Sequence, residues 1–196
     1  MKKLFRDHSY DMVKMFLNQV ATAIFGFSLA LAAGKAENVM LRNVTSICAI
    51  LFYMFLLYTM TWELGFHDRA GVTSGRKKGN PYKGVLISLC ANIPNLILAF
   101  FIMLGTLIQT EFFGNIGAFC KSAAIFIEGM YTGVLANRIG GVQLNSLWIS
   151  YFLITVPAML VCGLAYLFGL KDTKFTSIFN RQQYPESDRD VKRKDD

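Results

Sequence analysis

The chain has 196 residues, of which 54% are hydrophobic and 17% charged, with a formal net charge of +7. Soluble domains are about 25% charged, and here four long stretches contain no Asp, Glu, Lys or Arg: residues 15–34, 43–62, 84–110 and 139–170. A membrane-spanning helix needs roughly 20 mostly apolar residues. The composition therefore predicts an all-α integral membrane protein. It argues against a soluble domain and, because no basic stripe with interleaved aromatics is present, against nucleic-acid binding.

The first predicted membrane segment covers residues 12–34 and carries two polar side chains, Asn18 and Gln19. Small or hydrogen-bonding residues recur along it in steps of four, and residues four apart share one ridge of a helix. Such a ridge lets another helix approach closely, and whether that helix belongs to the same chain or to a second copy stays open. The ridge runs Lys14, Asn18, Thr22, Gly26, Ala30 and Gly34.

The start of this segment also raises the question of a cleaved signal peptide, because Ala30-Leu31-Ala32 resembles a signal-peptidase site. The region before the apolar run is long and contains Asp7 and Asp11. We therefore expect the first segment to be retained.

The second segment, residues 43–62, leads into a glycine-rich and basic loop over residues 63–83. Basic clusters beside a membrane attract anionic lipid headgroups, so we expect this loop to contact them through Arg76, Lys77, Lys78 and Lys83. Its only grouping suited to acid–base or metal chemistry is Glu63, His67 and Asp68, which is a weak signal. We predict no catalytic residue and no metal site.

The third segment, residues 84–109, places Ser88, Asn92 and Asn95 on one helical face. Pro94 lacks an N–H and clashes with the preceding turn, so it predicts a kink beside these residues. Two interpretations stay open. The asparagines form a polar clasp with Asn18 or Gln19 of the first helix, or they line a solute site in a broken helix, as in transporters.

The fourth segment, residues 112–137, is the doubtful one, because it contains two charges, Lys121 and Glu128. Each charge costs about 2.5–3.5 kcal/mol at the centre of a spanning helix. The segment either crosses the membrane or is re-entrant, and in the second case Glu128 faces water. A buried Glu128 would be a candidate for proton or cation binding. Gly129 and Gly133 form a GxxxG packing pattern.

The last segment, residues 147–170, contains a second kinking proline, Pro157. Residues 171–196 mix acidic and basic side chains with few large apolar ones, which predicts a disordered tail. The fold predicted for residues 1–170 is thus a compact bundle of about five membrane-embedded helices, two of them proline-kinked. The four cysteines, one in each of four apolar segments, show no metal-binding spacing.

Basic residues favour the cytoplasmic side of membrane proteins. With four crossings, 16 of the 20 Lys and Arg lie on the side of the N-terminus, whereas five crossings divide them equally. The rule favours four crossings in the cell membrane, with the N-terminus, residues 63–83 and the tail in the cytoplasm. Five crossings remain the alternative, because charges far along a tail count for less.

The function predicted from these features is transport-related: solute or ion handling, alone or as the membrane component of a transporter. The alternatives are a non-catalytic accessory subunit of a larger membrane complex and, least supported, a lipid-modifying enzyme. The candidate residues for a solute-lining site or a helix clasp are Asn18, Gln19, Asn92, Asn95 and Glu128. We expect no cofactor. The expected partners are the lipid bilayer and anionic headgroups, with a second copy or a larger membrane partner as further candidates.

Overall fold

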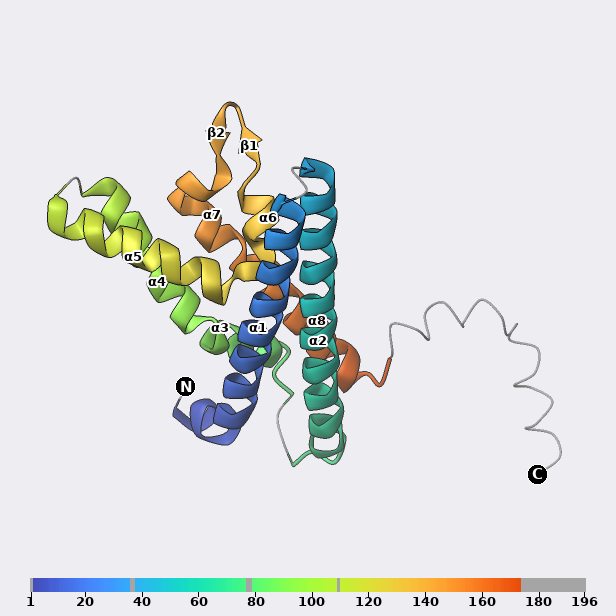
Figure 1. Ribbon diagram of the computed structural model, residues 1–196. Coiled ribbons are helices and arrows are strands. Elements are labelled where there is room, and N and C mark those ends of the chain that lie inside the picture. Colours follow the sequence, from blue (N-terminus) through green and yellow to red (C-terminus); the bar gives the residue numbers. More distant parts are fainter. Residues whose placement is uncertain (1, 36–37, 77–78, 109, 174–196) are drawn as a thin grey trace, which may run out of the picture.

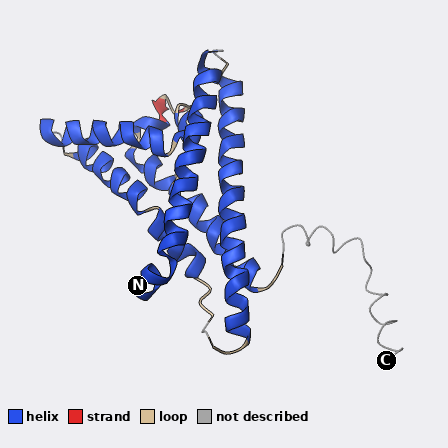
Figure 2. Ribbon diagram, turned by 60° about the horizontal axis from the view of Figure 1, so that its bottom comes forward, coloured by secondary structure: helices blue, strands red, loops and turns tan. Residues whose placement is uncertain are grey.

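The computed structural model describes residues 2–35, 38–76, 79–108 and 110–173. Two long antiparallel helices, α1 (Lys2–Lys35) and α2 (Val39–Thr73), lie side by side and form one wall of the molecule (Figures 1 and 2). The last helix, α8 (Thr155–Leu170), packs along α2. The predicted all-helical class is confirmed for the described residues, apart from one short β-hairpin.

Three helices are long and apolar enough to cross a membrane: His8–Lys35, Val39–Thr73 and Trp148–Leu170. A fourth candidate is a pair, α3 (Lys83–Ala91) and α4 (Ile93–Leu107), whose axes bend by 58° at Asn92. These lengths and compositions fit a helical integral membrane protein.

The chain between α3 and α8 is a series of broken helices. α4 and α5 (Glu111–Ile127) pack as a hairpin that leans away from α1 and α2 (Figure 1). After Glu128 the chain forms a 3-10 turn, η1, and the single-turn helix α6, and later a six-residue helix, α7, precedes α8. Their bounds are Gly129–Tyr131 for η1, Thr132–Leu135 for α6 and Trp148–Leu153 for α7.

A small antiparallel hairpin, β1 (Arg138–Ile139) and β2 (Val142–Gln143), lies at the end of the bundle where α1 meets α2 (Figure 1). Gly140 and Gly141 form its turn with positive φ angles of 61° and 84°, which glycine adopts without strain. A second 3-10 turn, η2 (Leu144–Ser146), leads on to α7. The start of α1 and the end of α8 both lie toward the opposite end of the molecule, on different sides of the bundle (Figure 1).

Two predicted boundaries were wrong. The second helix does not end at residue 62 but continues to Thr73, so the first half of the predicted loop is helical. Its polar extension is anchored because Asp68 is buried against Lys83 and Tyr166. The predicted segment 112–137 is also not one helix, since α5 ends at Ile127 and Glu128 has non-helical angles (φ −116°, ψ 25°).

The small residues of the predicted ridges are used within the chain. A Cβ on Gly26 would lie 2.5 Å from the Cα of Met130, and one on Gly129 would lie 2.4 Å from the carbonyl oxygen of Ala23. These two glycines let η1 press against α1. Gly133 meets α2 in the same way, and its N–H donates to Ser46 Oγ at 2.9 Å.

Two predictions concern residues outside the described part of the chain. Most of the predicted disordered tail, from residue 174 onward, lies there, as do Lys77 and Lys78 of the predicted lipid-binding cluster.

Candidate functional site

A small cavity lies where α1, α2, the α3–α4 pair, η1 and the start of α8 meet. About 10 Å³ of it is open to the centre of a water molecule, which is room for about one water. We call it the central cavity. Its polar lining residues are Gln19, Tyr53, Asn92, Asn95, Glu128, Tyr131 and Thr155.

Three breaks in the helices converge on the central cavity. Asn92 separates α3 from α4, Glu128 ends α5, and Ile154 separates α7 from α8. Pro94 and Pro157 follow two of these breaks within three residues, which agrees with the clash of a proline ring with the preceding turn. Irregular backbone in a membrane protein is tolerated only where it is buried in protein or lines a cavity, and here all three breaks line one.

The two asparagines hold each other in place. Asn92 Nδ2 donates to the carbonyl oxygen of Ser88 at 2.9 Å, and Asn95 Nδ2 donates to Asn92 Oδ1 at 2.9 Å. Asn95 is 1% exposed, and its Oδ1 has no hydrogen-bond partner among the described residues. One amide oxygen on the cavity wall is thus left available as an acceptor.

Glu128 lies between the central cavity and a second cavity. It is 3% exposed, and within the described part of the chain its Oε2 has no hydrogen-bond partner. The second cavity, with about 60 Å³ open to water centres, is also lined by Thr132, Asn145 and Tyr151. Of the described residues that line the two cavities, only Glu128 is acidic and none is Lys, Arg or His.

Gln19 and two tyrosines surround this carboxyl group. Tyr53 OH donates to Gln19 Oε1 at 3.4 Å, and Gln19 Nε2 donates to the carbonyl oxygen of Ile127, the last residue of α5, at 3.3 Å. Gln19 therefore ties α1 and α2 to the end of the helix that carries Glu128. Tyr131 is 6% exposed, and its hydroxyl has no partner among the described residues.

Four of the five predicted site residues, Gln19, Asn92, Asn95 and Glu128, thus line one cavity. Asn18 does not, because its amide donates to Met60 Sδ at 2.9 Å. Among the described residues, Asn92 and Asn95 form their side-chain hydrogen bonds within their own helix pair and not with the first helix. Sequence reasoning missed Tyr53 and Tyr131, because tyrosine inside an apolar run carries no distinguishing pattern.

Lys83, predicted to contact lipid headgroups, lies in a different environment. Its ammonium group forms an ion pair with the Asp68 carboxylate, which also accepts a hydrogen bond from Tyr166 OH at 2.9 Å. The side chains of Lys83 and Asp68 are only 14% and 8% exposed. This cluster joins α2, α3 and α8, and of the predicted basic residues that are described only Arg76 is fully exposed.

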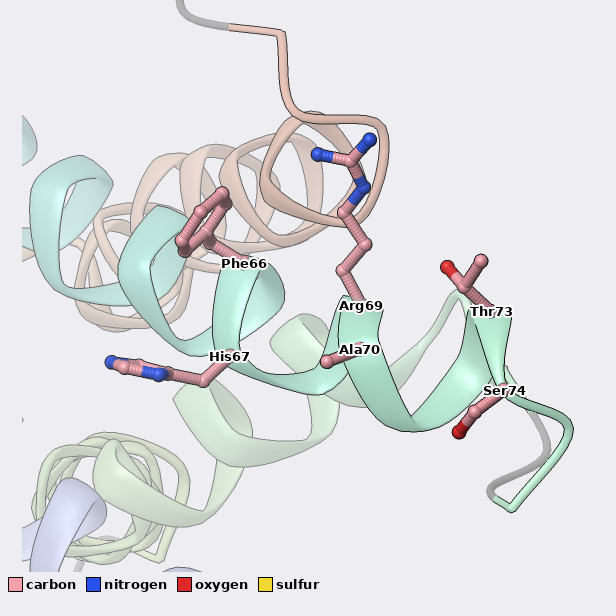
Figure 3. A pocket seen from close by; sticks show the side chains of 6 residues that line it. All are labelled: Phe66, His67, Arg69, Ala70, Thr73 and Ser74. Carbon is pink, nitrogen blue, oxygen red and sulfur yellow. The ribbon is translucent and has the colours of Figure 1, made fainter.

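A wider, shallow hollow follows the last turns of α2, beside residues 66–74, and is lined in part by His67 and Arg69 (Figure 3). Arg69 forms an ion pair with Asp172, at the end of α8. His67 lies 3.7 Å from Glu63 on the exposed side of α2, whereas Asp68 is buried. The three residues considered for acid–base chemistry therefore do not form one cluster.

The described residues contain no group of three or more His, Cys, Asp or Glu side chains that could hold a metal ion. Comparison of the chain with protein-family models, with curated proteins and with solved structures finds no match.

Proposed function

We propose that this chain is an ion-handling transport protein, acting alone or as the membrane component of a transporter, with the central cavity as its binding site. The observation that carries the proposal is the buried Glu128 carboxyl group, whose Oε2 has no partner in the described structure at the point where three helix breaks meet. Transporters build their ion sites from such discontinuous helices.

The energetics of burial support this role. A charged side chain in the middle of the membrane costs about 2.5–3.5 kcal/mol on insertion scales. No Lys, Arg or His among the described lining residues offsets the charge of Glu128. A carboxyl group that costs this much, and whose Oε2 has no partner among the described residues, is best explained by a ligand that it binds and releases.

The proposal includes a membrane placement. The start of α1 and the end of α8 lie toward one end of the bundle, and the α1–α2 turn and the β-hairpin lie at the other (Figure 1). With the bent α3–α4 pair as one span, this arrangement supports four crossings, with α5 embedded as a fifth segment. The distribution of basic residues puts the termini and residues 74–82 in the cytoplasm of a cell-membrane protein, where Arg76 contacts anionic lipid.

The test is ion flux in proteoliposomes. The purified protein is reconstituted and an inward gradient of H⁺ or Na⁺ is imposed, while internal pH or radioactive sodium is followed. We expect flux with the wild type, none with Glu128→Gln, and unchanged flux with Glu63→Gln, whose carboxylate is exposed. Equal flux in Glu128→Gln would contradict the proposal, and wild-type vesicles no more permeable than empty ones would contradict the version in which the chain acts alone.

The accessory-subunit alternative is favoured by one observation. The outer face of α5 exposes three small residues spaced by four: Gly114, Ala118 and Ser122. Such a ridge suits helix docking in a membrane. Gentle purification followed by native mass spectrometry tests this alternative, which predicts a stoichiometric membrane partner and no ion flux without it.

A further inference from the structure

We propose that the ligand of the central cavity is a single small monovalent cation, Na⁺, held by oxygen atoms of Asn95, Glu128 and Tyr131. The inference deepens the proposed function and rests on it for the role of the site. It begins from three residues that line one cavity, each of which has a buried oxygen atom without a partner among the described residues.

The oxygen atoms determine the chemistry of the ligand. Asn95 Oδ1 and Glu128 Oε2 can only accept, the latter when ionised, and the Tyr131 hydroxyl can also present its lone pairs. The three residues are 1%, 3% and 6% exposed, so bulk water does not satisfy them. Hard cations prefer carbonyl, carboxylate and hydroxyl oxygen. An anion would be repelled by Glu128, and an apolar ligand would leave all three oxygens unpaired.

The charge balance favours a monovalent ion. Glu128 is the single carboxylate on the walls of the two cavities, which no described Lys, Arg or His lines. The titratable side chains that interact electrostatically with Glu128 are Tyr131, Tyr151 and Tyr53. Tyrosine is neutral at physiological pH. One positive charge therefore neutralises the site, whereas a divalent ion would leave a buried net charge.

The C-terminal end of one helix, α5, adds to this preference. α5 is a 17-residue helix whose C-terminal end, at Ile127, lies next to Glu128. The carbonyl end of a helix carries about half a negative charge, and helix ends of this kind bind Na⁺ or H⁺ in transporters. The field of α5 therefore acts in the same direction as the carboxylate.

The two cavities differ in size, which suits the smaller one to a dehydrated ion and the larger one to a hydrated ion. The central cavity has room for about one water molecule, so it suits a small, dehydrated ion better than K⁺. The second cavity, with about 60 Å³ open to water centres, has room for several waters on the other side of Glu128. A hydrated ion in the second cavity would exchange its water ligands stepwise for the oxygen atoms of the central cavity.

The test is equilibrium binding to the purified full-length protein in detergent, independent of any transport. The melting temperature is measured in sodium, lithium, potassium or choline chloride at constant ionic strength. We expect a saturable rise with Na⁺, an affinity at least about tenfold lower for K⁺, and no rise with choline. Glu128→Gln removes the response, and Tyr131→Phe, which keeps the ring and its packing, weakens Na⁺ affinity about tenfold.

The control is Tyr166→Phe, which removes a buried hydroxyl on α8 outside both cavities and should leave Na⁺ affinity unchanged. Equal responses to Na⁺ and choline, or unchanged Na⁺ affinity in Tyr131→Phe, would overturn the inference, even if Glu128→Gln does not fold. Proton flux without a sodium response would overturn the Na⁺ site and leave the proposed function standing. Sodium binding without flux would support the site and contradict ion transport by this chain alone.

Discussion

Gly129 tests whether the contact between η1 and α1 holds the site together. In Gly129→Ala the new Cβ would lie 2.4 Å from the carbonyl oxygen of Ala23 and 2.9 Å from Phe27 Cβ. The nearer atom is backbone, so it cannot rotate away, and α1 and η1 must separate by about 1 Å to reach the ordinary contact distance of roughly 3.5 Å. Overpacking of this kind costs about 1–3 kcal/mol.

For a chain of this size each kcal/mol lowers the melting temperature by about 2–4 °C, so we expect a fall of about 2–12 °C. The assay is thermal unfolding of the purified protein in detergent, followed by tryptophan fluorescence. Gly114→Ala is the matched control, because a Cβ there meets no atom within 4 Å. An unchanged melting temperature in Gly129→Ala, or an equal loss in Gly114→Ala, would refute the argument from close approach.

Three further predictions concern charges. In sodium-free choline buffer at alkaline pH, Glu128→Gln should melt higher than the wild type, because it removes a buried carboxylate, while the exposed Glu63→Gln should not. A lower melting temperature for Glu128→Gln alone would show that the protein itself neutralises the carboxylate. Sodium affinity should fall as pH is lowered, since protons compete for Glu128 in the same melting assay, and a pH-independent affinity would contradict carboxylate ligation. Lys83→Met should destabilise the protein by about 3–5 kcal/mol by removing the ammonium that neutralises buried Asp68. Asp68→Asn in the same chain should restore part of the loss in thermal unfolding.

The sequence was sufficient to find the polar side chains that do not belong in an apolar run. Gln19, Asn92, Asn95 and Glu128 were identified because amides and acids are costly in lipid and must face something other than hydrocarbon. Their meeting in one cavity could not be predicted. It depends on three helix breaks that meet in space, and no proline near Glu128 predicts the break there.

Other features depend on contacts between distant positions that no local pattern encodes. Lys83 looked like one more basic loop residue, yet it pairs with Asp68 across the turn that joins α2 to α3. The same pairing explains why α2 extends well past its apolar run to Thr73, where the composition predicted a loop. The hydroxyl of Tyr131 could not be identified either, because its lack of a hydrogen-bond partner among the described residues depends on the tertiary structure around it.

The α4–α5 hairpin has a mechanical consequence. It is joined to the rest of the chain at two breaks, Asn92 and Glu128, and both residues lie on the wall of the central cavity. A rigid rotation of the hairpin about these two pivots would carry Asn95 with it and change its distance from Tyr131, which η1 holds against α1. Displacement of the hairpin in the bilayer would therefore alter the affinity of the cavity. By thermodynamic reciprocity, an ion bound there would favour one hairpin position over the others.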